Sequence, residues 1–364
     1  MSQLFSPIRL RALELPNRIV VSPMCQYAAE EGRMQDWHLM HLGQFAMGAA
    51  ALVFTEATHV SPEGRITLRC AGLWNDAQEA EMRRIFDFCR TWGVARLGVQ
   101  LAHAGRKGSC TTQLQGNNSL TEAEGAWQTV APSALPYRDD WHVPAALDRA
   151  GMDKVRDDFV AATQRCLRLG VDVLELHGGH GYLLNQFFSP LSNRRDDEYG
   201  GSLEKRLRFP LEVFEAVRRA WPEDRPLGMR ISAVDWVEGG TTIEDTIAFA
   251  RALEDLGCDF VDITSGGIDP RQKIEVGPGY QVGLAAAVKR AVGMPVMAVG
   301  MITSAQQAEA VIAEGQADFV MLARGMMYDP RWAWHAAREL GAETAYPDQY
   351  VRCIPARWPQ AFGR

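Results

Sequence analysis

Short runs of consecutive apolar residues alternate along the chain with longer stretches in which apolar residues recur every three or four positions. The short runs are rich in Val, Ile and Leu, which is typical of parallel strands that are buried on both faces. We expect eight such strands, at residues 19–24, 51–57, 95–102, 171–178, 226–233, 260–267, 295–300 and 319–325.

The stretches between these runs have the spacing of amphipathic helices. The clearest cover residues 76–93, 152–170 and 242–257, and each of the three ends in a glycine, a common helix-terminating residue. Eight strands, each followed by a helix, predict a single (β/α)8 TIM barrel over residues 1–364. A doubly wound sheet is the alternative, but no GxGxxG turn follows the first strand, as a dinucleotide-binding version requires.

A barrel of this type needs only about 250 residues, so the chain has a surplus. We assign the surplus to a hairpin under the barrel floor (1–18), two active-site loops (105–150 and 180–203) and a C-terminal arm (342–364). Long structured loops in a compact domain usually carry function. Both loops follow predicted strands, at the face where barrels keep their active sites.

Composition narrows the classes of function. The chain has 38 basic and 45 acidic residues and a net charge of -7, which argues against nucleic-acid binding as its main task. No segment approaches the roughly 20 apolar residues of a spanning helix, and Pro7, Arg9, Arg11 and Glu14 interrupt any signal-peptide core. The seven cysteines contain no CxxC pair and indicate no disulfide framework. We expect a cytoplasmic, reduced protein.

Unusual polar residues and glycines collect at the carboxyl ends of seven of the eight predicted strands. In strand order they are Ser22–Cys25, Glu56–Ala57, Gln100 with His103, His177 with His180, Arg230, Gly300–Met301 and Arg324–Gly325. These ends meet at one face of a barrel, so the pattern predicts one shared site there.

The ends of the last two predicted strands suggest a phosphate site. Gly300 and Gly325 allow a ligand to approach the backbone, and Arg324 adds a bidentate hydrogen-bond donor. The alternative is that these glycines only form tight turns between strand and helix.

Two imidazoles three residues apart, His177 and His180, can donate hydrogen bonds to one oxygen atom. Tyr182 follows with a phenol that can supply a proton. The alternatives are buried structural histidines, or a metal site that recruits His103, although no acidic residue accompanies them.

Cys25 and Tyr27 follow the first predicted strand, where a thiol and a phenol would border a ligand. A lone cysteine is more often structural. Arg230 lies within an otherwise apolar strand and is costly to bury unless it meets an anion. A structural ion pair is the alternative for Arg230.

Together these residues resemble the Old Yellow Enzyme family of flavin-dependent ene-reductases, and within it the bacterial xenobiotic-reductase and thermophilic-like branch. The resemblance covers essentially the whole chain and includes a GYQV segment to which we assign no role. Its most specific stretches are NRIVVSPMCQY (17–27), QLAHAGRK (100–107), ELHGGHGYLLNQFFSPLSNRRDDEYGGSLEKRLRF (175–209), AVGMIT (298–303) and RGMMYDP (324–330). Gly178 and Gly179 depart from the family pattern, because alanines are frequent at these positions in this branch.

The resemblance implies FMN across the mouth of the barrel. Cys25 would tune the flavin, Arg230 would face its N1–C2 carbonyl side, and Lys107 is a further candidate at the flavin or substrate edge. The phosphate would lie on Arg324 and on the backbone of Gly300 and Met301. The implied flavin-binding residues are Ser22, Pro23, Met24, Cys25, Ala57, Gln100, Arg230, Gly300, Met301, Ala323 and Arg324.

The resemblance also implies the reaction. NADPH or NADH would reduce the flavin, and the reduced flavin would then pass hydride to the double bond of an α,β-unsaturated carbonyl or nitro compound. His177 and His180 would bind the substrate oxygen, Tyr182 would donate the proton, and Tyr27 would border the substrate. A metal-dependent hydrolase that uses His103, His177 and His180 is the alternative function.

The end of the chain resembles the arm that, in this branch, lends a residue to the active site of a neighbouring subunit. The implied assembly is a homodimer or a dimer of dimers. Arg352 is the favoured residue by register, followed by Trp358, with Arg357 as the third candidate.

Overall fold

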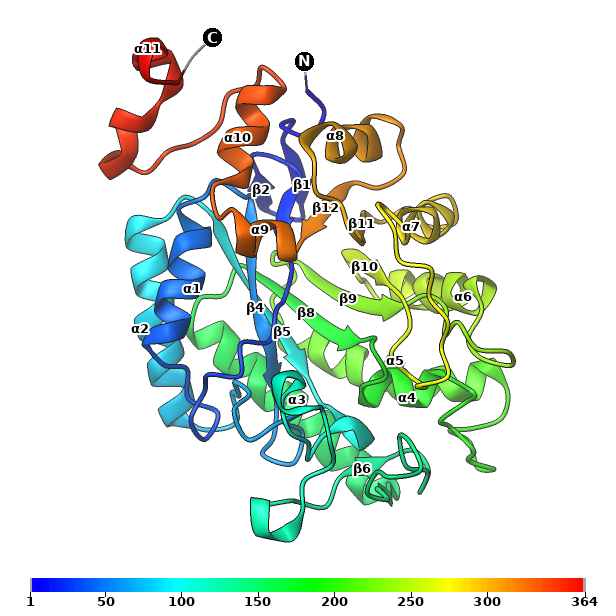
Figure 1. Ribbon diagram of the computed structural model, residues 1–364. Helices are drawn as coiled ribbons and strands as arrows, with labels where there is room; N and C mark the ends of the chain where they lie inside the picture. The colour runs from blue at the N-terminus through cyan, green and yellow to red at the C-terminus, as the bar shows by residue number, and fades with distance from the viewer. Residues whose placement is uncertain (1, 363–364) are drawn as a thin grey trace.

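A closed barrel of eight parallel strands forms the centre of the computed structural model, which describes residues 2–362 (Figure 1). Around the barrel the strands follow chain order, and β12 pairs with β3 to close it. This arrangement confirms the predicted TIM barrel. The strands are β3 (Ile19–Val21), β4 (Leu52–His59), β5 (Arg96–Ala102), β8 (Val173–Gly178), β9 (Leu227–Ser232), β10 (Phe260–Thr264), β11 (Val296–Val299) and β12 (Phe319–Leu322).

The predicted strand positions are right, but several predicted ends are wrong. β3 ends at Val21, so Ser22–Cys25 form the start of a loop instead of the end of a strand. Pro23 in this segment has no N–H to donate to a neighbouring strand. β4 continues beyond its apolar run to His59. Arg324 begins a short helix, α9 (Arg324–Tyr328), and does not end β12.

Helices cover the outside of the barrel, as the spacing of apolar residues predicts. In α2 (Asp76–Trp92), the side chain of Asn75 caps the first turn by accepting a hydrogen bond from the backbone N–H of Gln78. The same helix buries Met82, Ile85 and Phe86 against the core. The outer helices are α1 (Asp36–Ala46), α2 (Asp76–Trp92), α3 (Arg149–Arg168), α5 (Leu203–Ala220), α6 (Ile243–Asp255), α7 (Val282–Lys289), α8 (Ala305–Ala313) and α10 (Trp332–Glu339).

The hairpin expected under the barrel is present. β1 (Ile8–Leu10) pairs antiparallel with β2 (Leu13–Leu15), and the hairpin buries Leu10 and Leu15 against the first residues of the barrel strands. It therefore closes the end opposite to the predicted site. Met1 of this segment, and 363–364 of the predicted arm, lie outside the described residues.

The two segments expected to be loops contain short regular elements. In 105–150 a small parallel sheet, β6 (Val130–Ala131) with β7 (Ala145–Ala146), lies among three single-turn helices, and α3 already begins at Arg149. That early start follows from Asp148, whose side chain accepts from the Gly151 backbone and caps the helix. In 180–203 the helix α4 (Leu183–Phe188) is buried.

The C-terminal segment extends from α10 as the helical turns η4 (Asp348–Cys353) and η5 (Pro355–Arg357) and the helix α11 (Pro359–Phe362), drawn in red at the edge of Figure 1. Trp358 is 52% exposed, and Arg352 and Arg357 are exposed. Within the described residues, every helix is too short or too polar to cross a membrane.

Candidate active site

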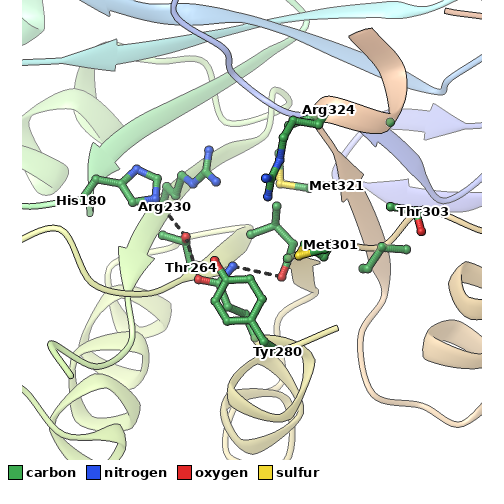
Figure 2. Close-up of a pocket in the computed structure, with 14 residues that line it drawn as sticks. His180, Arg230, Thr264, Tyr280, Met301, Thr303, Met321 and Arg324 are labelled. Atoms are coloured by element: carbon green, nitrogen blue, oxygen red, sulfur yellow. Dashed lines mark hydrogen bonds between the residues drawn. The ribbon is translucent and has the colours of Figure 1, made fainter. Parts of the chain in front are cut away.

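A cavity of about 340 Å³ opens at the carboxyl ends of β9 to β12. Figure 2 shows the side chains of Arg230 and Arg324 pointing into this cavity, with His180 at its edge. The predicted site residues that line it are His180, Arg230, Gly300, Met301, Ala323 and Arg324. The structure therefore brings together residues from four distant parts of the sequence.

The backbone around Gly300 suits a phosphate group. Gly300 has φ +125°, and a Cβ at this position would lie 2.9 Å from Nε2 of Gln281, so only glycine fits. The nearest neighbour of a Cβ at Gly325 would be the Ile302 carbonyl oxygen at 4.0 Å, so the backbone there is open to a ligand. Gly300 is therefore needed for the tight turn that follows β11. The cavity and Arg324 beside it favour an anion site as well.

The structural interpretation of Arg230 is confirmed, and the ligand-binding interpretation stays a prediction. Its guanidinium is buried, with Nε 2.8 Å from Oδ2 of Asp262 in an ion pair that lacks hydrogen-bond alignment. Nη1 donates to Oγ of Ser22 at 3.2 Å, which joins the end of β3 to β9. Arg230 also lines the cavity, so the guanidinium serves a structural ion pair and faces the ligand space.

A layer of buried polar side chains lies below the cavity. Glu175 is fully buried and accepts from Nε2 of Gln100 at 2.7 Å. Burial, followed by the charge of Asp262, raises the pKa of Glu175 to about 8. Burial also raises the pKa of Asp262 to about 6. At neutral pH Glu175 therefore stays largely protonated, and the charge of Arg230 has only one close carboxylate to balance it.

The two histidines form a directed chain of hydrogen bonds. The Gly179 backbone donates to Nδ1 of His177 at 3.3 Å, so the proton of a neutral His177 is on Nε2. That nitrogen lies 3.3 Å from Nδ1 of His180, and Nε2 of His180 lies 2.9 Å from Oγ1 of Thr264. Burial first, and then nearby positive charge including Arg230, lowers the pKa of both imidazoles well below 6.5.

Tyr182 packs beside these histidines, with its ring centroid 5.0 Å from that of His177. Tyr27, Cys25 and Tyr182 all pack against one apolar cluster around Cys70 and Trp141, which confirms that they share one region. Burial raises the pKa of Tyr182 and of Cys25 well above their usual values, so both keep their protons at neutral pH.

Lys107 connects two loops at this region. Its ammonium group donates to the carbonyl oxygens of His180 and Gly267 at 2.8 and 2.7 Å. It also lies 5.2 Å from the ring centroid of Tyr182 and 4.8 Å from that of Tyr137. Burial, followed by the charge of Arg106, lowers the pKa of Lys107 to about 8.

Other predicted residues lie outside the 340 Å³ cavity. Gln100 contacts Glu175 below it, and Arg352 and Trp358 lie on the C-terminal arm. The predicted flavin-edge residues that do not line the cavity are Ser22, Pro23, Met24, Cys25, Ala57 and Gln100.

The metal alternative is not supported. His103 is buried, and its Nδ1 accepts from the Gly105 backbone at 3.1 Å. Among residues 2–362, His, Cys, Asp and Glu side chains nowhere form a group of three that could hold a metal ion. The metal-dependent hydrolase predicted as the alternative function therefore has no metal site in the described structure.

Sequence reasoning missed Thr264, Tyr280, Gln281 and Thr303, which also line the cavity. Gln281 connects the end of β10 to the end of β11: Oε1 accepts from Ser265 at 2.6 Å and from Thr264 at 3.3 Å, and Nε2 donates to the Val299 carbonyl at 3.2 Å. The GYQV segment was a signal for Tyr280 and Gln281, although the motif alone assigned them no task.

Comparisons with known proteins identify the family of the chain. The model of the NADH:flavin oxidoreductase / NADH oxidase family matches residues 3–343. An NADPH dehydrogenase of Geobacillus sp. (strain WCH70) is 40% identical over 353 residues, which are 96% of this chain and 98% of the relative.

Two solved structures share the fold. Morphinone reductase in complex with tetrahydroNAD has a TM-score of 0.77 at 27% identity, covering 96% of this chain and 93% of that one. A 2-naphthoyl-CoA reductase complex has a TM-score of 0.83 at 23% identity over 93% of this chain, which spans about half (52%) of that longer protein. The chain therefore belongs to the NADH:flavin oxidoreductase / NADH oxidase family, that of the Old Yellow Enzymes, and is an FMN-dependent oxidoreductase that uses NAD(P)H.

Proposed function

We propose that the protein is an ene-reductase, which reduces the carbon–carbon double bond of α,β-unsaturated carbonyl or nitro compounds with electrons from NADPH or NADH. The observation that carries this proposal is the hydrogen-bonded pair of His177 and His180 beside Tyr182, with His180 at the edge of the cavity that Arg230 lines. Hydrogen-bond donors and a proton donor next to a flavin site are the groups that this reaction needs.

FMN, when bound, supplies the hydride acceptor and donor. Its phosphate is expected on Arg324, beside Ala323 and the backbone of Gly300 and Met301, where the cavity combines a cation with open backbone. Arg230 is expected beside the ring edge that gains negative charge. Gln100, Ala57 and Ser22–Cys25 are expected along the remaining ring edge; the contact of Ser22 with Arg230 supports this assignment.

The histidines are expected to bind the substrate oxygen as neutral donors. The Nε2–H of His177 donates to Nδ1 of His180, and the Nε2–H of His180 donates to Oγ1 of Thr264. A substrate oxygen therefore accepts either hydrogen bond only by taking the place of that acceptor atom. Both donors then stabilise the negative charge that develops on this oxygen. Tyr182 keeps its proton until the adjacent carbon accepts it, and Tyr27 borders the same space.

The C-terminal arm is expected to complete the site of a neighbouring subunit in a homodimer or a dimer of dimers. The exposure of Arg352, Arg357 and Trp358 supports this assignment, because none of them lines the cavity of its own chain. Arg352→Ala is expected to weaken substrate binding and leave the flavin spectrum intact. Unchanged binding in both Arg352→Ala and Trp358→Ala would rule out these two residues.

The experiment compares His177→Ala/His180→Ala with the parent enzyme in the reoxidation of the reduced flavin by 2-cyclohexen-1-one. Loss of the two donors should slow this step by roughly 10²–10³-fold. His335→Ala, which removes an exposed histidine on α10, is the matched control. Reduction of the enone by the double variant at the parent rate would show that the histidines have no such role.

A further inference from the structure

A second cavity, of about 550 Å³, lies between the loops that follow β5, α4 and β10. Four arginines line it, and we call it the arginine pocket: Arg106, Arg138, Arg194 and Arg271. Only two aspartates, Asp139 and Asp269, share this lining. The chain as a whole has a net charge of -7, so this concentration of positive charge is local.

Two of the four arginines have carboxylate partners. Arg138 pairs with Asp140 at 2.6 Å and Arg271 with Asp269 at 2.7 Å. Arg194 is exposed and has no side-chain partner among the described residues. Positive charge therefore remains available in the pocket.

Arg106 is the strongest sign of an anion site. Its side chain is 4% exposed and forms no ion pair with any described carboxylate. Its Nη atoms donate only to the carbonyl oxygens of Leu135, Pro136 and Ile268, and its Nε has no hydrogen-bond partner. Asp269 is the nearest charge of opposite sign, and it is paired directly with Arg271 instead. A buried cation that no carboxylate contacts is costly, and an anion in the pocket would lower that cost.

The arginine pocket adjoins the catalytic region. Tyr137 lines the pocket, and the Lys107 ammonium group lies between its ring and that of Tyr182, at 4.8 and 5.2 Å from the two centroids. A ligand whose reactive ring lies beside Tyr182 can therefore extend past Tyr137 into the pocket. The pyridine dinucleotide is a reactant that is long and carries phosphates, so it can place a phosphate among the arginines.

We propose that the arginine pocket binds a phosphate group of the pyridine dinucleotide that delivers hydride, either the 2′-phosphate of NADPH or the pyrophosphate that NADPH and NADH share. This inference rests on the proposed function, because it concerns the donor of that reaction. A donor without phosphate tests the two separately.

The experiment measures the dissociation constant of each donor from the rate of flavin reduction under anaerobic conditions. The donors are NADPH, NADH and 1-benzyl-1,4-dihydronicotinamide, which has no phosphate. Arg194→Ala and Arg194→Glu should weaken NADPH binding about tenfold or more, the loss expected for a hydrogen bond to a charged group. Arg194→Lys should restore part of it.

Reduction by 1-benzyl-1,4-dihydronicotinamide should be unchanged in every variant, and its failure in the parent would count against the proposed function instead. A loss for NADPH alone assigns the 2′-phosphate to the pocket, and an equal loss for NADPH and NADH assigns the pyrophosphate. As a second readout, 2′,5′-ADP should bind the parent holoenzyme more tightly than the Arg194→Glu holoenzyme in calorimetry.

Arg9→Ala is the matched control, because it removes an exposed arginine at the opposite end of the barrel. Unchanged affinity for both dinucleotides in the Arg194 variants would overturn the proposal. An equal loss for all three donors would also overturn it, because the phosphate would then play no part.

Discussion

Nε2 of His177 lies 3.3 Å from Nδ1 of His180, and the two rings stand at 88° to one another. Together with the Gly179 donor and the Thr264 acceptor, this contact assigns one tautomer to each imidazole. Two protonated imidazoles could not share it, because the contact needs an acceptor nitrogen on His180.

We therefore predict that both histidines stay neutral throughout the physiological range. Burial and nearby cations lower both pKa values well below 6.5. The ¹⁵N ring signals of His177 and His180, assigned by single substitution, should show no titration between about pH 6 and 8. A midpoint within this interval would contradict the account.

Tyr182→Phe should separate the two halves of the reaction. The phenol keeps its proton because burial raises its pKa, so it is available to the substrate carbon. Its removal should slow reoxidation by an enone by roughly 10²-fold or more and leave flavin reduction by NADPH unchanged. Tyr328→Phe, which changes a 94% exposed tyrosine at the end of α9, is the control. Equal rates of reoxidation in parent and variant would exclude Tyr182 as the proton donor.

Flavin retention should depend on the cavity at the ends of β11 and β12. Arg324→Ala should weaken FMN binding to the apoprotein by roughly 10–100-fold, because a charge-assisted contact with phosphate is lost. Gly300→Ala should also weaken it, because a Cβ there meets Gln281 and the backbone has φ +125°. Quenching of FMN fluorescence on binding to the apoprotein measures the affinity of both variants. Full retention of FMN by both variants would place the phosphate elsewhere.

Glu175 should make the folded state less stable as pH rises. Its pKa is raised to about 8 by burial and Asp262, so the folded protein holds a proton that the unfolded chain has lost above its ordinary pKa of 4.5. This stabilisation disappears as pH rises toward 8. Buried histidines with lowered pKa values make the folded state less stable as pH falls below about 6.5. The effect of Glu175 on stability is therefore measured above that pH.

The measurement is urea unfolding of parent and Glu175→Gln at pH 6.5 and 8. Between pH 6.5 and 8, the free energy of unfolding of the parent should fall by on the order of 1 kcal/mol more than that of the variant. An equal dependence on pH in both proteins would mean that Glu175 is ionised at pH 6.5.

The barrel was predictable because its signal is local. Each apolar run reports its own burial, so all eight strands were found, while their ends were not. β3 stops at Val21 and α3 begins at Arg149 because of loop and capping contacts that periodicity does not encode. The hairpin and the placement of polar residues at strand ends were predictable for the same local reason.

The missed features depend on contacts between distant segments. Thr264 is unremarkable in sequence, yet its hydroxyl accepts the His180 hydrogen bond and donates to Oε1 of Gln281. The ion pair of Arg230 depends on Asp262, which lies directly opposite it on the neighbouring strand. The arginine pocket combines three loops, so no single stretch of sequence indicates it.

The most direct test of the ene-reductase assignment is an anaerobic titration of the purified holoenzyme followed by its flavin absorbance. NADPH should bleach the spectrum, and one equivalent of 2-cyclohexen-1-one should restore it with formation of cyclohexanone. The saturated ketone, added as a control, should restore nothing. A bleached spectrum that stays bleached in the presence of the enone and recovers only with oxygen would contradict the assignment.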